Sequence, residues 1–308
     1  MLADKAEPQI ELSIWEKLQY WLLRPLVHGC NRATEEELNQ TAREGPTLDL
    51  RAGQQRLAKL IARLEGRLRI QPDLSYLDVG CGSGDLACAL IQAGARDVTG
   101  IDIVSRNIEA ARSTVSQVLR NESSPIFVHA DINTWEPAHR YDVVFSHEAL
   151  EHIDRPDRFI QSLTRLMKPN GCAVLAFGPL FHSPIGDHLW GFFRVQIPWR
   201  GLIFSEKVLL QLRREFFRLT DNALRFQDIT GGLNLMRYSE FLKYVSEAGL
   251  EFEFLSINPQ LKRIRPLYHL SRGLVRLPVV QDYFVVSVYA ILERERSPRS
   301  IPPSSHPP

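Results

Sequence analysis

The chain has 308 residues, 44% of them hydrophobic, and its 37 Lys and Arg residues nearly balance its 36 Asp and Glu residues. This length is sufficient to bury a full core, and a net charge of +1 gives no basic field for nucleic acid. Four cysteines without a C-x-x-C pair, and no run of roughly 18 apolar residues, exclude a disulfide scaffold, a cysteine zinc site and a membrane span, and favour a soluble cytoplasmic protein.

Two helices are predicted before the first strand. Apolar residues recur at helical spacing over Leu12–Val27, and a second helix rich in Arg and Leu is predicted over Leu50–Leu68. We therefore interpret residues 1–49 as an N-terminal helical extension and place the main domain at 50–296.

A glycine-rich turn follows the first predicted strand, in the run Leu77-Asp78-Val79-Gly80-Cys81-Gly82-Ser83-Gly84. A strand that enters a helix through glycines brings backbone amides and a helix N-terminus up to a ligand. A dinucleotide fingerprint needs a third glycine where Asp85 stands. Carboxylates at Asp78 and Asp85 suit a ligand that carries an ammonium and a sulfonium group better than one that carries a pyrophosphate.

Further strands alternate with helical segments after this turn. They are predicted at Asp97–Asp102, Ile126–Ile132, Tyr141–Ser146 and Cys172–Phe177, and the alternation predicts a parallel sheet with helices on both faces. Asp102 lies about 20 residues past the glycines, where an acid accepts hydrogen bonds from ribose hydroxyls in nucleoside-binding sheets. The last two strands are predicted at Glu251–Ile257 and Tyr283–Leu292, with a helix over Leu267–Leu277 between them.

The order of these motifs resembles the class I S-adenosylmethionine (SAM)-dependent methyltransferases, and in particular their type 11 subgroup, which includes ubiquinone-biosynthesis enzymes. The resemblance is strong from Ser75 to Gly178. It rests on the glycine turn, Gly-Ile-Asp at 100–102, Ala-Asp-Ile at 130–132, Tyr-Asp-Val-Val-Phe at 141–145 and Leu-Met-Lys-Pro-Asn-Gly at 166–171. It implies an α/β, Rossmann-like fold with a seven-stranded sheet of order 3-2-1-4-5-7-6, strand 7 antiparallel, and helices on both faces.

The resemblance also implies SAM as the cofactor, bound outside the carboxyl ends of the strands. Asp78 is expected at the amino group, Asp102 at the ribose hydroxyls, and Asp131 with the backbone of Ile132 at the adenine edge. Ser146 and His147 are expected beside the methyl group. The complete set of expected cofactor-binding residues is Asp78, Gly80, Cys81, Gly82, Gly84, Asp102, Ile103, Asp131, Ile132 and Ser146.

Methyl transfer from a sulfonium requires little beyond the correct geometry, so the remaining question is which group takes the proton of the acceptor. His152 is the first candidate for a general base, because histidine titrates near neutral pH. A purely structural role for His152 is the alternative. The expected catalytic residues are His152, His147, Glu148, His182 and His188.

Glu148, Glu151 and His152 form the pattern E-x-x-E-H, which resembles the metal-binding pattern of ubiquinone O-methyltransferases and of small-RNA terminal-ribose methyltransferases. Two carboxylates and an imidazole could hold Mg²⁺ or Mn²⁺ and lower the pKa of a hydroxyl group. Many type 11 methyltransferases carry a similar Leu-Glu-His without a metal. We therefore expect no metal and keep the metal site as the alternative.

An insertion rich in aromatic residues, prolines and glycines follows the fifth strand at 178–250, and we expect it to form a lid on the acceptor side. It carries His182 and His188. We expect methyl transfer to a hydroxyl oxygen of a small-molecule or glycan-type acceptor, with no nucleic acid as partner. No Asn/Asp-Pro-Pro-Tyr tetrapeptide of nucleic-acid methyltransferases follows strand 4.

The aromatic residues of the first helix leave two interpretations open. Trp15, Tyr20 and Trp21 would fit peripheral contact with a membrane surface, but aromatic residues at helical spacing more often face a core, which is the expectation here. The oligomeric state stays open. The Pro- and Ser-rich tail at 297–308 is expected to be disordered.

Two other functions are weighed against methyl transfer. A nicotinamide-dependent oxidoreductase is disfavoured by Asp85 in place of the third glycine, and by the absence of a Tyr-x-x-x-Lys dyad near strand 5. A non-catalytic SAM-binding protein would keep the glycines and acids without turnover, so the sequence does not distinguish it from an enzyme.

Overall fold

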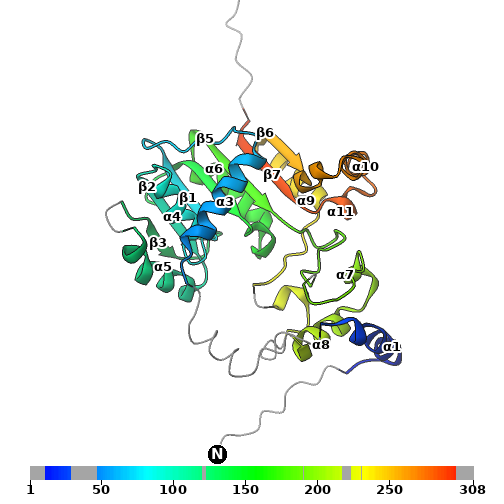
Figure 1. Cartoon of the computed structure of the whole chain (residues 1–308). Helices are drawn as coiled ribbons and strands as arrows, with labels where there is room; N and C mark the ends of the chain where they lie inside the picture. The colour runs from blue at the N-terminus through cyan, green and yellow to red at the C-terminus, as the bar shows by residue number, and fades with distance from the viewer. Residues whose placement is uncertain are drawn as a thin grey trace, which may run out of the picture.

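The computed structural model describes residues 11–28, 47–119, 123–189, 191–216, 223–229 and 231–295. Its centre is one seven-stranded sheet of order β3-β2-β1-β4-β5-β7-β6 (Figure 1). The pairs from β3 to β5 are parallel, whereas β7 is antiparallel to both β5 and β6. The expected fold and strand order are confirmed. The strands are β1 (Ser75–Val79), β2 (Asp97–Asp102), β3 (Ile126–His129), β4 (Tyr141–His147), β5 (Met167–Phe177), β6 (Leu250–Ile257) and β7 (Val288–Arg294).

Helices cover both faces of the sheet, which is why its central strands are apolar on both sides. Alternate residues of β1 enter different apolar clusters, Tyr76 on one face and Leu77 on the other. The first face packs against α3 (Leu50–Arg63), α4 (Asp85–Gln92) and α5 (Ser105–Val118). The second face packs against α6 (Pro156–Leu166) and α9 (Tyr238–Glu247).

Several element boundaries differ from the sequence-based expectation. The segment Gln281–Phe284 forms the short helix α11, where the last strand was expected to begin. Asp282 accepts hydrogen bonds from the backbone N–H and hydroxyl of Ser239, both at 2.8 Å, which joins this helix to the start of α9. β3 ends at His129 because Asp131 opens a turn in which the N–H of Trp135 donates to its carbonyl at 2.8 Å.

Other boundaries shift as well. Strand β5 begins five residues before the expected Cys172, at Met167. The expected helix over Leu12–Val27 is α1 (Ile14–Leu23) followed by the 3₁₀ turn η1 (Arg24–Leu26). The helix expected at Leu267–Leu277 is α10 (Arg265–Val275). The C-terminal tail at 297–308 lies outside the described residues.

The insertion and the N-terminal helix share a second, smaller core. The helices α7 (Arg200–Ile203), α8 (Glu206–Phe216) and α1 lie together beside the sheet (Figure 1). Their cluster is separate from the two sheet clusters, and the N–H of Arg194 donates to Leu26 O at 2.8 Å. The N-terminal helix is therefore packed on the insertion. The cluster comprises Leu23, Val27, Leu189, Phe193, Val208, Leu209, Leu210, Leu212, Phe226 and Leu233.

Helix α9 belongs to the sheet core, although the insertion was expected to extend to residue 250. Its residues Tyr238, Phe241 and Val245 are buried in the cluster of the second sheet face. We therefore propose that the insertion comprises residues 178–237.

The outer face of α1 is exposed, so the expectation that its tryptophans face a core is wrong. Trp15 is 67% exposed and Trp21 is 75% exposed, and Ile14, Leu18 and Leu22 are exposed beside them. The opposite face supplies Leu23 to the insertion core. Within the described ranges, no helix has the length and apolar character needed to cross a membrane.

Candidate active site

The glycine turn is held against the ends of β1 and β2. Gly80, Gly82 and Gly84 have φ values of 73°, 55° and 90°, which L side chains rarely adopt. The N–H groups of Gly80 and Cys81 donate to Ile101 O at 2.8 and 3.0 Å. A Cβ at Gly84 would lie 2.5 Å from Phe127 Cζ, so α4 begins in close contact with β3.

Asp102 lies at the end of β2 with its carboxylate directed to the glycine turn. Its Oδ2 accepts from the N–H of Gly82 at 2.8 Å. Its Oδ1 accepts from the N–H of Val104 at 2.8 Å and from Asn107 Nδ2 at 3.3 Å. The structure therefore brings together the acid and the glycines that the sequence pattern associates, and contact with a ribose stays a prediction.

Asp78 is the most deeply buried acid of this region, with 2% of its surface exposed. Its Oδ2 has no hydrogen-bond partner among the described residues. Burial, and secondly the charge of Asp102, raise the pKa of Asp78 to about 7. A buried carboxyl group without a partner is costly unless a ligand supplies one, so this position suits a cationic group.

A cavity of about 710 Å³ opens at the carboxyl ends of β1 and β2. This volume lies within the usual range for small-molecule sites. Of the expected cofactor residues, it is lined by Gly80, Gly82, Asp102, Ile103, Asp131 and Ile132. On the opposite side it is lined by insertion residues that the sequence did not single out: Gln227, Ile229, Gly231 and Gly232.

A second cavity of about 290 Å³ extends from the same glycines and is lined by Asp78 and by Arg56 of α3. Arg56 Nη1 contacts Asp85 Oδ2 at 2.7 Å, and the N–H of Asp49 donates to Asp85 Oδ1 at 2.8 Å. Asp85 thereby holds α3 against the glycine turn. A guanidinium and a buried carboxyl in one compartment match an amino-acid zwitterion, so the residues present fit the methionine portion of SAM.

Of the remaining expected cofactor residues, Cys81 lines the second cavity, whereas Ser146 and Gly84 do not. The side chain of Cys81 belongs to the apolar cluster of the first sheet face, and burial raises the pKa of its thiol well above the usual value. Ser146 is fully buried in β4, and its Oγ has no partner among the described residues. Neither Ser146 nor Gly84 lines either cavity.

His147 and Glu148 stand at the end of β4, where the compartments meet. Glu148 has a φ of 52° and lines both cavities as well as a third one of about 170 Å³. The third cavity is also lined by His147, Lys59 and Arg63. Burial lowers the pKa of His147, and its Nδ1 lies 4.0 Å from Glu148 Oε2.

The residues of the E-x-x-E-H pattern point in different directions. Glu151 is buried, its Oε1 accepts from the N–H of Gly178 at 3.0 Å, and burial raises its pKa to about 7. His152 is exposed on the other side of the 3₁₀ turn η2 (Leu150–His152) and lines the largest cavity. In the described part of the chain, no group of three or more His, Cys, Asp or Glu side chains could hold a metal ion. The geometry thus gives the metal alternative no support.

His152 is positioned by the end of the insertion. Its Nδ1 lies 2.6 Å from Gly232 O, across 80 residues of sequence. Asn234 holds this segment in place, because its Nδ2 donates to Leu150 O at 2.6 Å and to Ile153 O at 2.8 Å. The hydrogen bond to Gly232 O requires a proton on Nδ1, which leaves Nε2 of a neutral ring as an acceptor.

The two insertion histidines occupy different surroundings. The ring of His188 meets that of His152 edge-on, with centroids 5.6 Å apart, and its Nε2 lies 2.9 Å from Pro179 O. His182 instead packs between Phe181 and Tyr283. Neither histidine lines any of the three cavities. Burial lowers the pKa of both histidines. The structure thus places His188 beside His152 and leaves His182 apart.

Several cavity residues have no recognisable signal in the sequence. Arg56 is one of three arginines on its helix, and Asn107 lies in the first turn of α5. The others come from the segments after β3 and after η2 and from the insertion, where no spacing distinguishes them from their neighbours. The cavity residues without such a signal are Arg56, Asn107, Asn133, Arg155, Arg158, Gln227 and Ile229.

Known proteins with related sequences were compared with this chain. The profile of a family described as a methyltransferase domain matches residues 50–253. A ubiquinone biosynthesis O-methyltransferase of Rickettsia bellii (strain OSU 85-389) is 31% identical over 121 residues, which are 39% of this chain and 49% of that protein. One of Psychrobacter arcticus is 37% identical over 105 residues, 32% of this chain and 39% of that protein. The chain spans about half the length of these relatives, or less.

A solved structure gives a comparison of the fold. The crystal structure of the cyclase SpnF aligns with a TM-score of 0.50 and 16% sequence identity, over 82% of this chain and 84% of that chain. This likeness concerns the arrangement of the strands and helices alone.

Proposed function

The chain belongs to the class I SAM-dependent methyltransferases, and we propose that it transfers the methyl group of SAM to a hydroxyl oxygen of a small-molecule or glycan-type acceptor. The observation that carries this proposal is the junction formed by His147 and Glu148. Glu148 lines all three cavities, and the largest of them joins the donor-side residues Asp102 and Asp131 to His152 and the insertion, so that donor and acceptor can meet there. The relatives named O-methyltransferases support a hydroxyl as the acceptor group.

The donor would be held by residues of β1, β2, α3 and the segment after β3. Asp78 and Arg56 face the compartment that suits the methionine ammonium and carboxylate. Asp102 lies where two ribose hydroxyls would donate, and Asp131 with Ile132 lines the space for the adenine. Bound SAM would supply a methyl group that is already activated on a sulfonium.

The acceptor proton would pass to a histidine of the chain. His152 is our first candidate, because its ring lines the largest cavity with Nε2 available. His147 is the second candidate, because burial favours its neutral form and the nearby Glu148 carboxylate would stabilise the imidazolium that forms. Proton removal is the only chemical step asked of these histidines, since correct positioning of the acceptor supplies much of the rate.

Two measurements test the proposal. Calorimetry with S-adenosylhomocysteine is expected to show binding, and labelled SAM is expected to give methylated products with a panel of phenols, catechols and sugars. Methylation of amines alone would contradict the hydroxyl acceptor. Absence of donor binding would contradict the assignment of the site.

The variants His152→Asn and His147→Asn distinguish the two candidate bases. Loss of the general base is expected to lower kcat by about 100-fold or more, with donor affinity unchanged. If His152 is the base, only its variant also loses the acid limb of the pH–rate profile. Equal, small effects in both variants would show that neither group takes the proton.

Two alternative functions are an oxidoreductase and a non-catalytic SAM-binding protein. A nicotinamide-dependent oxidoreductase is not favoured, because the matching family profile is that of a methyltransferase domain. A non-catalytic SAM-binding protein is distinguished by the labelled-methyl experiment, in which it would bind donor without forming product.

A further inference from the structure

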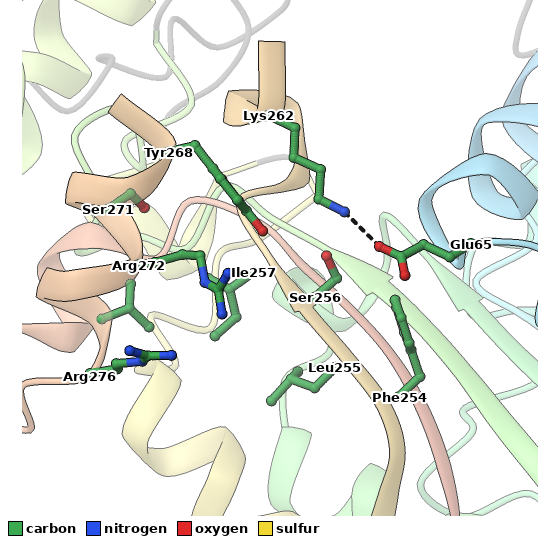
Figure 2. A pocket seen from close by; sticks show the side chains of 11 residues that line it. Glu65, Phe254, Leu255, Ser256, Ile257, Lys262, Tyr268, Ser271, Arg272 and Arg276 are labelled. Carbon is green, nitrogen blue, oxygen red and sulfur yellow. Dashed lines mark hydrogen bonds and ion pairs between the residues drawn. The ribbon is translucent and has the colours of Figure 1, made fainter. Parts of the chain in front are cut away.

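A cleft of about 320 Å³ lies at the β6 edge of the sheet (Figure 2). One wall is the edge strand β6, the other is α10, and the 3₁₀ helix η4 (Pro259–Arg263) closes one end. The cleft shares no lining residue with the three cavities around His147 and Glu148. It is therefore a second concave surface, separate from the methyl-transfer site.

The cleft is basic although the chain as a whole is nearly neutral. Residues 258–280 contain no Asp or Glu, and they carry Lys262, Arg263, Arg265, Arg272 and Arg276. Lys262, Arg272 and Arg276 line the cleft. The one acid of the lining, Glu65, contacts Lys262 Nζ at 2.7 Å. Among the described residues, neither Arg272 nor Arg276 forms an ion pair with a carboxylate.

The wall that carries these arginines is held rigidly by Asn258. Its Nδ2 donates to Ser271 Oγ and to Phe284 O, both at 2.7 Å, and its Oδ1 accepts from the N–H of Val286 at 2.8 Å. Ser271 accepts this bond with its oxygen, so its hydroxyl hydrogen stays available for a ligand. These bonds fix α10 beside the end of β6.

Side-chain placement gives the cleft a charged rim and an apolar floor. Figure 2 shows Arg272 and Arg276 extending from α10 toward β6. The Arg272 guanidinium lies 5.7 Å from the centroid of the Tyr268 ring, one helical turn away. The floor is formed by the apolar side chains Leu255, Ile257 and Val275.

We propose that this cleft binds the phosphate group of a phosphorylated ligand whose body is apolar. A guanidinium donates two parallel hydrogen bonds to phosphate oxygens, and two guanidiniums without a carboxylate partner match a dianion better than a carboxylate. The apolar floor accommodates the carbon skeleton next to the phosphate. The phosphate belongs either to a small metabolite or to a lipid headgroup.

Calorimetric titration with phenyl phosphate, at fixed ionic strength, tests the site in the full chain. Benzoate serves as the monoanionic comparison. The variant Arg272→Ala/Arg276→Ala is expected to weaken phenyl phosphate binding by about tenfold or more. The matched control is Arg263→Ala/Arg265→Ala, which removes the same charge from exposed positions of the same segment that do not line the cleft. The control is expected to bind within about twofold of the unaltered chain.

Two results would overturn the proposal. One is the absence of phenyl phosphate binding to the unaltered chain at millimolar concentration. The other is an equal loss in both double variants, which would mean general attraction to a basic segment. Affinity for S-adenosylhomocysteine is measured in the same samples and is expected to stay unchanged. This measurement distinguishes failure of the phosphate-site proposal from failure of the methyl-transfer proposal. Thermal unfolding verifies that both double variants fold.

Sedimentation with vesicles identifies the source of the phosphate. Binding to vesicles that contain phosphatidic acid, lost in Arg272→Ala/Arg276→Ala and kept in Arg263→Ala/Arg265→Ala, assigns a lipid headgroup. Phenyl phosphate binding without such selective loss on vesicles assigns a soluble metabolite. Vesicles of phosphatidylcholine alone provide the uncharged reference.

Discussion

The donor and acceptor sides of the candidate site are built in different ways. On the donor side, the glycine turn, Asp102 and Asp131 follow neighbouring parallel strands, so the register of the sheet places them at one edge. On the acceptor side, His152 depends on Gly232 and His188, which reach it from the insertion. The order of neighbouring strands therefore positions the donor-side residues, and contacts between segments far apart in the sequence position the acceptor-side residues.

The two sides also differ in what stabilises them. The donor side rests on the two apolar clusters of the sheet, whereas the insertion has its own cluster and a buried ion pair. In that pair Arg200 Nε lies 2.8 Å from Asp187 Oδ2 and Nη2 lies 3.1 Å from Oδ1, with both side chains 2% exposed. The insertion should therefore lose its packing independently of the sheet, and the following variants test that difference.

The largest effect is expected from Asp187→Asn. It leaves the Arg200 guanidinium buried without its charge partner, which costs about 3–5 kcal/mol of the free energy of unfolding. Hydrogen exchange is expected to show lost protection in α8 and the residues around Phe193, with the amides of β1 and β4 still protected. Uniform loss over both regions would contradict separate cores. The control is Arg225→Ala, which removes an exposed pair with Asp228 and is expected to cost about 1 kcal/mol or less.

The second-largest effect is expected from Asp102→Ala, on the donor side. It removes the acceptor for the N–H groups of Gly82 and Val104 as well as the predicted ribose contact. Calorimetry is expected to show affinity for S-adenosylhomocysteine reduced by about 100-fold or more. Protection of the insertion amides is expected to stay unchanged. An unaltered affinity would show that Asp102 does not belong to the donor site.

Gly53→Ala tests whether α3 belongs to the donor side. A Cβ at this position would lie 2.0 Å from Asp85 O, so α3 must move away from the glycine turn, at a cost of about 1–3 kcal/mol. Donor affinity is expected to fall because Arg56 moves with the helix. The control is Gly273→Ala in α10, where a Cβ has no atom within 4 Å and helix propensity is expected to stabilise the chain by about 0.5–1 kcal/mol. Loss of stability without loss of donor affinity would show that α3 does not contribute to the donor site.

The smallest effect concerns pH. With a pKa of about 7, Asp78 is protonated at pH 6, whereas a cationic donor favours its ionised form. Donor affinity is therefore expected to rise with pH, by at most about tenfold per unit below pH 7, and to level off above it. The variant Asp78→Asn is expected to flatten this slope. Glu151→Gln is the comparison, because the Glu151 pKa is also about 7 but its carboxyl lies outside the donor compartments.

The same two acids affect stability with the opposite sign. A carboxyl whose folded pKa is raised binds a proton that the unfolded chain has released between about pH 4 and 7. The free energy of unfolding is therefore expected to fall as the pH rises through this window and to stay level above it. Denaturant titrations of Asp78→Asn and Glu151→Gln are expected to show a shallower fall in each. An unchanged slope in both variants would contradict the raised pKa values.

Much of the donor side could be predicted from the sequence because its signals are local. The alternation of apolar residues predicted β2 with its observed bounds, and the turn glycines predicted the glycine turn before α4. The expectations failed where a distant contact intervenes. The segment Gln281–Phe284 is helical where a strand was expected, with Asp282 bound to Ser239, and the tryptophans of α1 are exposed because its opposite face packs on the insertion.

The amino-acid pattern alone therefore determined the parallel strands and the acids at their carboxyl ends, because strand period and turn chemistry act over a few residues, whereas the strand order followed from the family resemblance. Tertiary structure alone decided that Arg56 faces Asp78, that His188 rather than His182 meets His152, and that Glu148, Glu151 and His152 diverge. Each of these outcomes depends on how helices and loops from distant parts of the chain pack together. Spacing along a sequence does not encode such packing.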